Sequence, residues 1–387
     1  MQFLSRFLTS RWGPPATGVV IGVLAPILAR LGNPGNMGVC VACFTRDIAG
    51  ALALHRAAPV QYLRPEIPGF VLGSLLAAWV FGEFRPRTGS APLVRFLLGM
   101  FAAIGALVFL GCPWRALLRL SGGDGNAMPG ILGLIGGIWL GIVFLRRGFS
   151  LGRSRRGPRA LGWMMPGLMA GLLLLVVFGP QMGRGADGEA TGPIFFSAQG
   201  PGSQHAPLVA ALAAGLLIGF LAQRSRFCTV GGVRDLILMR DPHLFNGVLA
   251  LVVVAAITNA LLGQFQPGFQ GQPIAHTAVA WNLLGMVLAG LAFTLGGGCP
   301  GRQFFLSGEG DGDAGLFAMG LIVGSAFAHN FSLASSPAGP GAYGPAAVVF
   351  GLLVCIAIGC TMREPESPAP RPAAAHRRET AAAGGVQ

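Results

Sequence analysis

Ten runs of apolar residues, each about 16 to 22 residues long, recur along the whole chain. A helix needs about 20 apolar residues to span the hydrocarbon core of a bilayer, so each run is long enough to cross a membrane. The spacing therefore predicts an all-α integral membrane protein with about ten transmembrane helices. The runs occupy residues 14–29, 66–84, 93–112, 129–145, 160–180, 207–223, 243–264, 281–298, 315–331 and 344–362.

The composition agrees with a membrane protein. Of the 387 residues, 53% are hydrophobic and 11% charged, whereas a soluble domain carries about 25% charged residues. All 27 basic residues are arginine, which excludes a Walker-type phosphate loop and a lysine Schiff base. The arginines lie in short loops between apolar runs, where the positive-inside rule accounts for them. We therefore expect membrane lipid, and no nucleic acid, as a partner despite the net charge of +13.

The arginines also predict how the chain is oriented. Residues 144–160 hold six arginines and are expected to be cytoplasmic. Alternation from this loop places both termini in the cytoplasm of a multi-pass protein of the bacterial inner membrane. The tail from 363 to 387, rich in Pro, Ala, Arg and Glu, is expected to be disordered and cytoplasmic. Residues 55–65 fall outside in this topology although they contain two arginines, against the rule.

Two motifs occur twice, in the same order. The pattern C-x5-R-D is followed by G-C-P-x-R, eight residues, and then D-G-[N/D]-A. The offset between the copies is 188 residues for the first motif and 187 for the second, which indicates an internal duplication. The first copy holds Cys40, Arg46, Asp47, Cys112, Arg115 and Asp124, and the second holds Cys228, Arg234, Asp235, Cys299, Arg302 and Asp311.

Five of the predicted spans separate Cys40 from Cys228, and an odd number inverts the second copy relative to the first. Inverted repeats with broken helices near the middle of the membrane are typical of transporters. We expect a first membrane repeat over 1–165, a second over 166–362, and short re-entrant half-helices in each.

The residues of G-C-P-x-R predict a particular local chemistry. Proline fits the first turn of a helix, which puts the cysteine at or near the N-cap. A helix N-terminus presents free N–H groups and partial positive charge, which stabilise a thiolate or attract an anion. Arg115 and Arg302 add positive charge. Asp124 and Asp311 could pair with these arginines, because an unpaired arginine in a membrane is costly.

Other interpretations of the same residues stay open. A cysteine often only packs, which is the expectation for Cys355 and Cys360. The neighbouring pairs Arg46–Asp47 and Arg234–Asp235 could contact a substrate or be structural ion pairs.

Functional and structural roles are also both open for one cysteine pair and three further polar residues. Cys40 and Cys43 form C-x-x-C, a pattern of redox pairs and soft-metal sites, but Gly231 replaces the second cysteine in the other copy. His276, His329 and Asn330 lie in or near apolar runs, and either a functional or a structural role fits them.

At these residues the chain resembles the YeeE/YedE family of sulfur transporters, and most closely its YedE-type members, which are described as selenium transporters. The resemblance covers nearly the whole chain apart from the C-terminal tail. It rests on GNPGNMGVCVACFTRD (32–47), VQYLRPEIPG (60–69), FLGCPWR (109–115), SGGDGNA (121–127), GFSLGRS (148–154), GPGSQHAP (200–207), SRFCTVGGVRD (225–235), QPIAH (272–276), GGGCPGRQFFLSGEGDGDA (296–314) and AHNF (328–331).

The resemblance implies an hourglass-shaped, inverted-repeat importer of thiosulfate or a related anion. It implies that essential cysteines line a narrow central path and contact the sulfur of the substrate through weak S–H···S interactions. By motif these are Cys40, Cys112 and Cys299, with Cys228 as the remaining equivalent position. Genes of the YedE type tend to accompany a carrier protein of the TusA/YedF kind, which makes such a carrier a candidate cytoplasmic partner.

Together, the residues and the resemblance predict an inner-membrane importer of a small selenium- or sulfur-containing anion. The expected substrate-binding residues are the four repeated cysteines with Arg46, Arg115, Arg234 and Arg302. The sequence contains no nucleotide motif, catalytic triad or coherent set of metal ligands, so we expect neither enzymatic turnover nor a cofactor. The alternatives are a membrane thiol oxidoreductase that uses Cys40 and Cys43, and a soft-metal transporter.

Overall fold

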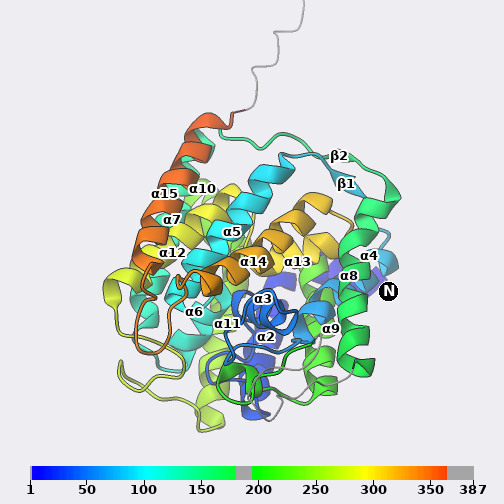
Figure 1. The fold of residues 1–387 in the computed structure, drawn as a ribbon. Helices are drawn as coiled ribbons and strands as arrows, with labels where there is room; N and C mark the ends of the chain where they lie inside the picture. The colour runs from blue at the N-terminus through cyan, green and yellow to red at the C-terminus, as the bar shows by residue number, and fades with distance from the viewer. Residues whose placement is uncertain (1, 180–193, 364–387) are drawn as a thin grey trace, which may run out of the picture.

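The computed structural model describes residues 2–179 and 194–363, and nearly all of its regular structure is α-helical (Figure 1). Each of the ten apolar runs forms a helix. The long helices are α2(Gly13–Arg30), α4(Glu66–Val80), α5(Pro92–Phe109), α7(Ala127–Arg146), α8(Arg159–Phe178), α9(Leu208–Ser225), α11(His243–Leu261), α12(Val279–Leu295), α14(Gly312–Asn330) and α15(Gly344–Thr361).

Within the described residues, 9 helical stretches are long and apolar enough to cross a membrane. The tenth, α4, has 15 residues, and it is shorter than the predicted run 66–84. It ends at Val80 because Gly82 adopts a left-handed conformation (φ 66°) and the polar Glu83 follows. Three of the nine stretches consist of a long helix and a short helix, with a non-helical segment between the two.

Four of the five shorter helices begin at the cysteines of the repeated motifs, and the fifth lies at the start of the described chain. They are α1(Gln2–Thr9), α3(Val41–Ala51), α6(Pro113–Ser121), α10(Thr229–Met239) and α13(Pro300–Gly308), with a 3-10 turn at Pro201–Ser203. Two strands of two residues, β1(Arg87–Thr88) and β2(Arg155–Arg156), pair in antiparallel orientation.

The long helices pack in four close pairs: α4 on α9, α2 on α11, α7 on α12 and α5 on α14. Glycines make the close approach possible. A Cβ atom on Gly73 of α4 would lie 2.1 Å from the carbonyl oxygen of Leu216 in α9, and one on Gly137 of α7 would lie 2.2 Å from that of Val287 in α12. Each pair joins a helix from before residue 165 to one from after it, so the two parts of the chain interlock.

Large apolar side chains also cover the outside of the bundle. Leu132 on α7, Val209 on α9, Leu261 on α11 and Phe350 on α15 are between 60% and 81% exposed. In water these side chains would form an unfavourable apolar surface, whereas in a bilayer they contact lipid. The nine spanning stretches and this surface describe a multi-pass membrane protein.

The two ends of the bundle differ. At one end, which we call the hairpin end, lie β1 and β2, and Arg87 pairs with Asp311 at the start of α14. Helix α15 also ends here, where the backbone N–H of Ser150 donates to the carbonyl of Met362 (Figure 1). At the opposite end, loops contact one another: the backbone N–H of Gly125 donates to Gly268, and Asn330 donates to Leu54. Apart from Arg363, the tail predicted to be disordered, 363–387, lies outside the described residues.

Candidate functional site

Each of four short helices begins at a cysteine. Cys40, Cys112, Cys228 and Cys299 are the N-cap residues of α3, α6, α10 and α13, all in extended backbone conformation. The sulfur of Cys40 accepts the N–H of Cys43, and the sulfur atoms of Cys228 and Cys299 accept an N–H in the same way, at 3.2 to 3.4 Å. Sulfur therefore occupies the place that a serine or aspartate oxygen takes in an ordinary helix cap.

Proline explains why two of these helices begin where they do. Pro113 and Pro300 occupy the first helical position, where their fixed φ suits the helix and the missing N–H costs nothing. The remaining N–H groups of each first turn point toward the cysteine end, so that four partially positive helix ends carry thiols.

The four cysteines form two pairs. The thiol of Cys40 lies 3.8 Å from the sulfur of Cys112, and the backbone N–H of Cys299 donates to the sulfur of Cys228 at 3.3 Å. Each pair combines a C-x5-R-D cysteine with a G-C-P-x-R cysteine of the same copy. All four are buried, with Cys228 the most exposed at 5%.

The helices that begin at Cys112 and Cys299 meet where a large residue, Trp114, contacts a glycine, Gly301. Trp114 follows Cys112 by two positions, and Gly301 follows Cys299 by two, so the two residues are equivalent in the motif. A Cβ atom on Gly301 would lie 3.0 Å from Cζ2 of Trp114. Aromatic rings of Phe70, Phe227 and Phe305 surround the indole at 5.9 to 6.0 Å between centroids. The indole therefore packs against the start of the helix that begins at Cys299.

Arg115 lies fully buried beside the Cys40–Cys112 pair. Its guanidinium donates to the sulfur of Cys43 at 3.7 Å and to three backbone carbonyls, those of Leu110, Pro273 and Ile274. Among the described residues it has no carboxylate partner, and its Nε has no acceptor at all. A buried cation without a counter-ion favours the approach of an anion.

Arg302 occupies the equivalent position in the second copy but has a different environment. Its backbone N–H donates to the sulfur of Cys299, and its guanidinium contacts Glu309 at 3.5 Å. The arginine beside the second pair of cysteines thus has a carboxylate nearby, at the long distance of 3.5 Å.

The expected pairing of Asp124 with Arg115 and of Asp311 with Arg302 is wrong. Asp124 binds Arg119 at 2.6 Å, and Asp311 binds Arg87 at 2.7 Å. Arg119 lies one turn further along α6, which brings its guanidinium to the end of the helix where Asp124 lies. Leu306 replaces Arg119 in the second copy, so Asp311 pairs with an arginine from β1.

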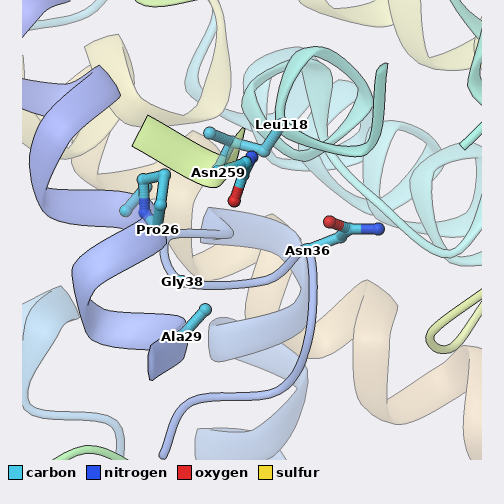
Figure 2. A pocket seen from close by; sticks show the side chains of 7 residues that line it. Pro26, Ala29, Asn36, Gly38, Leu118 and Asn259 are labelled. Carbon is cyan, nitrogen blue, oxygen red and sulfur yellow. The ribbon is translucent and has the colours of Figure 1, made fainter. Parts of the chain in front are cut away.

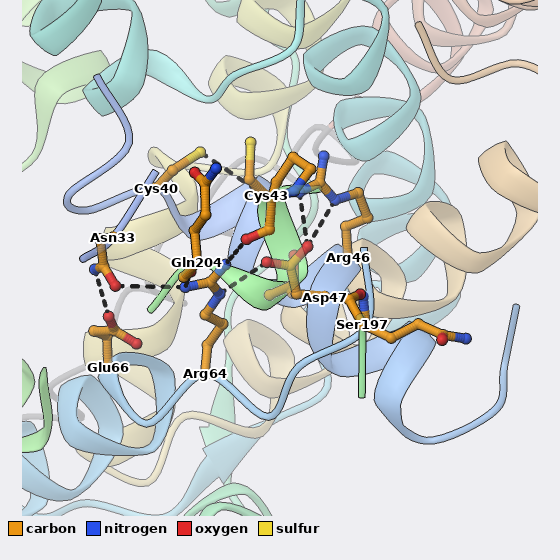
Figure 3. A network of polar contacts seen from close by, with 12 residues as sticks. Asn33, Cys40, Cys43, Arg46, Asp47, Arg64, Glu66, Ser197 and Gln204 are labelled. Atoms are coloured by element: carbon orange, nitrogen blue, oxygen red, sulfur yellow. Dashed lines mark hydrogen bonds and ion pairs between the residues drawn. The ribbon is translucent and has the colours of Figure 1, made fainter. Parts of the chain in front are cut away.

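The C-x5-R-D aspartates also bind arginine, in two different environments. Asp47 is buried and accepts from Arg46 at 2.7 Å and from Arg64 at 2.8 Å (Figure 3). Asp235 accepts from Arg234 at 2.8 Å, and their side chains are 13% and 28% exposed. Arg46 and Arg234 therefore orient toward their neighbouring aspartates.

Arg64 is a site residue that the pattern of the repeats does not reveal. Besides Asp47, it contacts the side chain of Asn33 and the carbonyls of Pro201 and Gln204 (Figure 3). Asn33 in turn donates to the buried Glu66. Arg64 belongs to the string YLRPE, in the loop whose predicted outside location runs against the positive-inside rule. That disagreement is the signal that could have identified it.

The polar residues predicted in or near apolar runs, His276, His329 and Asn330, contact the backbone or another ring. The ring of His276 is bonded to the carbonyl of Val108 at 2.8 Å. The rings of His329 and His55 stack with centroids 4.6 Å apart, and Asn330 donates to Leu54. These contacts hold the loops of the end opposite the hairpin. Cys355 is buried in α15, and Cys360 is exposed.

Two cavities lie beside the short helices α6 and α13. One, between α2, α6 and α11, is lined by Ala25, Pro26, Ala29, Asn36, Gly38, Leu118 and Asn259 (Figure 2). Its volume of about 10 Å³ suits a single water molecule. The second, of about 170 Å³, lies at the hairpin end and includes Arg302. Among the described residues, no three His, Cys, Asp or Glu side chains gather as a metal site would require.

Comparison with known proteins relates the second half of the chain to sulfur transport. Residues 224–375 match the profile of a family described as "Sulphur transport". The thiosulfate transporter TsuA of Escherichia coli (strain K12) is 32% identical over 107 residues, which is 27% of this chain and 29% of that protein. The thiosulfate transporter TsuA of Spirochaeta thermophila is 32% identical over 100 residues, 25% of this chain and 30% of that protein. The aligned parts thus span less than a third of each relative.

Proposed function

We propose that the protein imports a small anion with a sulfur or selenium atom at one end through a central path lined by cysteines. One observation carries the proposal: within residues 2–179 and 194–363 the buried guanidinium of Arg115 has no carboxylate partner, and it contacts the sulfur of Cys43 next to the Cys40–Cys112 pair. An anion supplies the missing negative charge, and its soft terminal atom suits the thiols. The match to the sulfur-transport family and to two thiosulfate transporters supports this class of substrate.

The proposed path connects the two pairs of cysteines. The anion binds first at Cys40 and Cys112, where Arg115 and the N–H groups of α3 and α6 attract its charged end. It then passes the indole of Trp114 and reaches Cys228 and Cys299. The thiols donate S–H to the outer atom of the anion, and no bond is broken. Arg46 and Arg234 act through their aspartates to hold α3 and α10 in place.

The helix packing supports two inverted repeats, which we propose to be 1–165 and 166–362. The pair α4–α9 has a counterpart in α11–α2, and α7–α12 has one in α14–α5, as an exchange of equivalent helices requires. The arginines in the loops at the hairpin end favour a cytoplasmic location for this end in the bacterial inner membrane. A carrier protein of the TusA/YedF kind is then the candidate acceptor of the imported sulfur or selenium.

Uptake by reconstituted vesicles tests the proposal and identifies the substrate. Purified protein is placed in liposomes, and the entry of labelled thiosulfate, selenite and sulfate is compared. We expect thiosulfate or a selenium anion to enter faster than sulfate, which has no soft terminal atom.

Cysteine variants test the path itself. We expect Cys112→Ala and Cys299→Ala each to lower uptake at least tenfold, while Cys360→Ala, which removes an exposed thiol on α15, leaves uptake unchanged. Uptake at the wild-type rate by both Cys112→Ala and Cys299→Ala would refute the cysteine path. A Cys43→Ser variant tests the oxidoreductase alternative, since a redox pair needs both sulfur atoms of Cys40 and Cys43.

A further inference from the structure

A charged pocket is lined in part by α13, the short helix that begins at Cys299. Its volume is about 170 Å³, which accommodates a small oxyanion. Arg302 forms part of its wall, and the backbone N–H of the same residue donates to the sulfur of Cys299. The pocket therefore begins one helical turn from the second pair of cysteines. Its lining is Glu83, Arg85, Arg87, Arg226, Arg302, Leu306 and Glu309.

The charges in this pocket favour an anion. Four arginines and two glutamates line it, so its formal charge is 4 − 2 = +2. The side chain of Glu309 is 2% exposed and lies among three guanidiniums. It is 2.9 Å from Arg226, 3.5 Å from Arg302 and 3.6 Å from Arg87. Arg87 also binds Asp311 at 2.7 Å, and Arg226 also binds Glu83 at 3.1 Å. Within the described part of the chain, Arg302 is therefore the cation of the three whose one carboxylate contact is the long one to Glu309.

The sequence shows that this counter-ion belongs to one copy of the motif only. Glu309 occupies the position of Gly122 in the first copy, 187 residues earlier, and Leu306 occupies that of Arg119. In the first copy Arg119 neutralises Asp124, and Arg115 has no carboxylate partner in the part of the chain that the structure describes. In the second copy a carboxylate already lies against the arginine. The two ends of the path therefore treat an incoming anion differently.

We propose that this pocket is a second anion-binding subsite, in which a small divalent oxyanion displaces the carboxylate of Glu309 from Arg302 and Arg226. The identity of the anion rests on the proposed function, since it would be the anion that leaves Cys228 and Cys299. When the anion departs, Glu309 returns to the guanidiniums. The carboxylate thus limits how tightly the anion is held and promotes its release at the hairpin end.

The substitution Glu309→Gln tests the subsite, because it removes the charge and keeps the shape. Binding of sodium thiosulfate and of sodium sulfate to the purified protein in detergent is measured by calorimetry. We expect Glu309→Gln to bind both anions at least fivefold more tightly than the wild type. In vesicles its KM and its maximal uptake rate should both fall, since release becomes slower. Asp241→Asn, which removes a charge from an exposed loop at the same end, is the matched control and should leave binding unchanged.

A second variant covers the case in which Glu309→Gln does not fold. Arg226→Gln removes one of the cations that the anion would contact, and we expect it to weaken the binding of both anions at least threefold. Unchanged affinity and unchanged uptake kinetics in whichever of the two variants folds would overturn the subsite.

The outcomes for the subsite and for the proposed function can be told apart. If Glu309→Gln tightens binding while Cys112→Ala and Cys299→Ala both transport at the wild-type rate, the subsite holds and the cysteine path fails. If Cys112→Ala abolishes uptake while neither Glu309→Gln nor Arg226→Gln changes binding, the path holds and the subsite fails.

Discussion

The two C-x5-R-D aspartates should differ sharply in how much they stabilise the protein, although the sequence makes them equivalent. Asp47 has a fully buried carboxylate between Arg46 and Arg64, whose side chains are 3% and 0% exposed. Removing one partner of a buried ion pair costs about 3–5 kcal/mol, because the other charge stays buried without compensation. Asp235 and Arg234 are 13% and 28% exposed, and a partly exposed pair contributes about 0–1 kcal/mol.

The substitutions Asp47→Asn and Asp235→Asn therefore form a matched pair that preserves shape and removes one charge. Unfolding is followed by a thiol-reactive dye, since the repeated cysteines are buried in the folded state. A Cys360→Ala background removes the signal of the exposed thiol. We expect a large fall in the unfolding temperature for Asp47→Asn and a fall of a few degrees at most for Asp235→Asn. Equal falls, or a larger one for Asp235→Asn, would refute the assignment of stability to burial.

Three further outcomes follow from the same geometry. Arg115→Gln should weaken substrate binding by roughly 10- to 150-fold in a calorimetric titration, because a charge-assisted contact contributes about 1.5–3 kcal/mol; unchanged binding would contradict the role of Arg115. Gly301→Ala should slow uptake, because its Cβ would lie 3.0 Å from Trp114, and Trp114→Phe in the same chain should restore the rate; failure of this rescue would exclude the contact as the barrier. Burial alone would raise the pKa of Glu83, but the amide of Gln223 and nearby arginines outweigh it and hold the pKa below its ordinary value. A lowered pKa gives stability that is present above the ordinary value and is lost as the pH falls through the folded one. Thermal unfolding of the wild type should accordingly shift downward in acid, and that of Glu83→Gln should shift less.

Local features of the site were predictable from the sequence because they depend on neighbouring residues. Proline after a cysteine fixes the start of a helix, and the structure places Cys112 and Cys299 at N-caps. The apolar runs likewise became helices, since length and hydropathy suffice to define a membrane-spanning segment.

The partners of the charged residues were not predictable, because they come from distant parts of the chain. Asp311 binds Arg87, which is 224 residues away, and Arg64 reaches Asp47 from a loop that no repeat marks. The spacing of G-C-P-x-R and D-G also favoured Arg115 as the partner of Asp124. The partner is Arg119, because it lies one helical turn closer to the end of α6 where Asp124 lies. Such choices depend on which helix faces which, and the repeat pattern carries no information about that.

The contact between Trp114 and Gly301 joins two different residues at equivalent positions of the repeated motif. In an assembly of two identical half-length subunits, the same residue would stand on both sides of this contact. Two indoles would collide there, and two glycines would leave a gap. When both copies of the motif lie in one chain, each side of this contact can change by itself, one residue at a time.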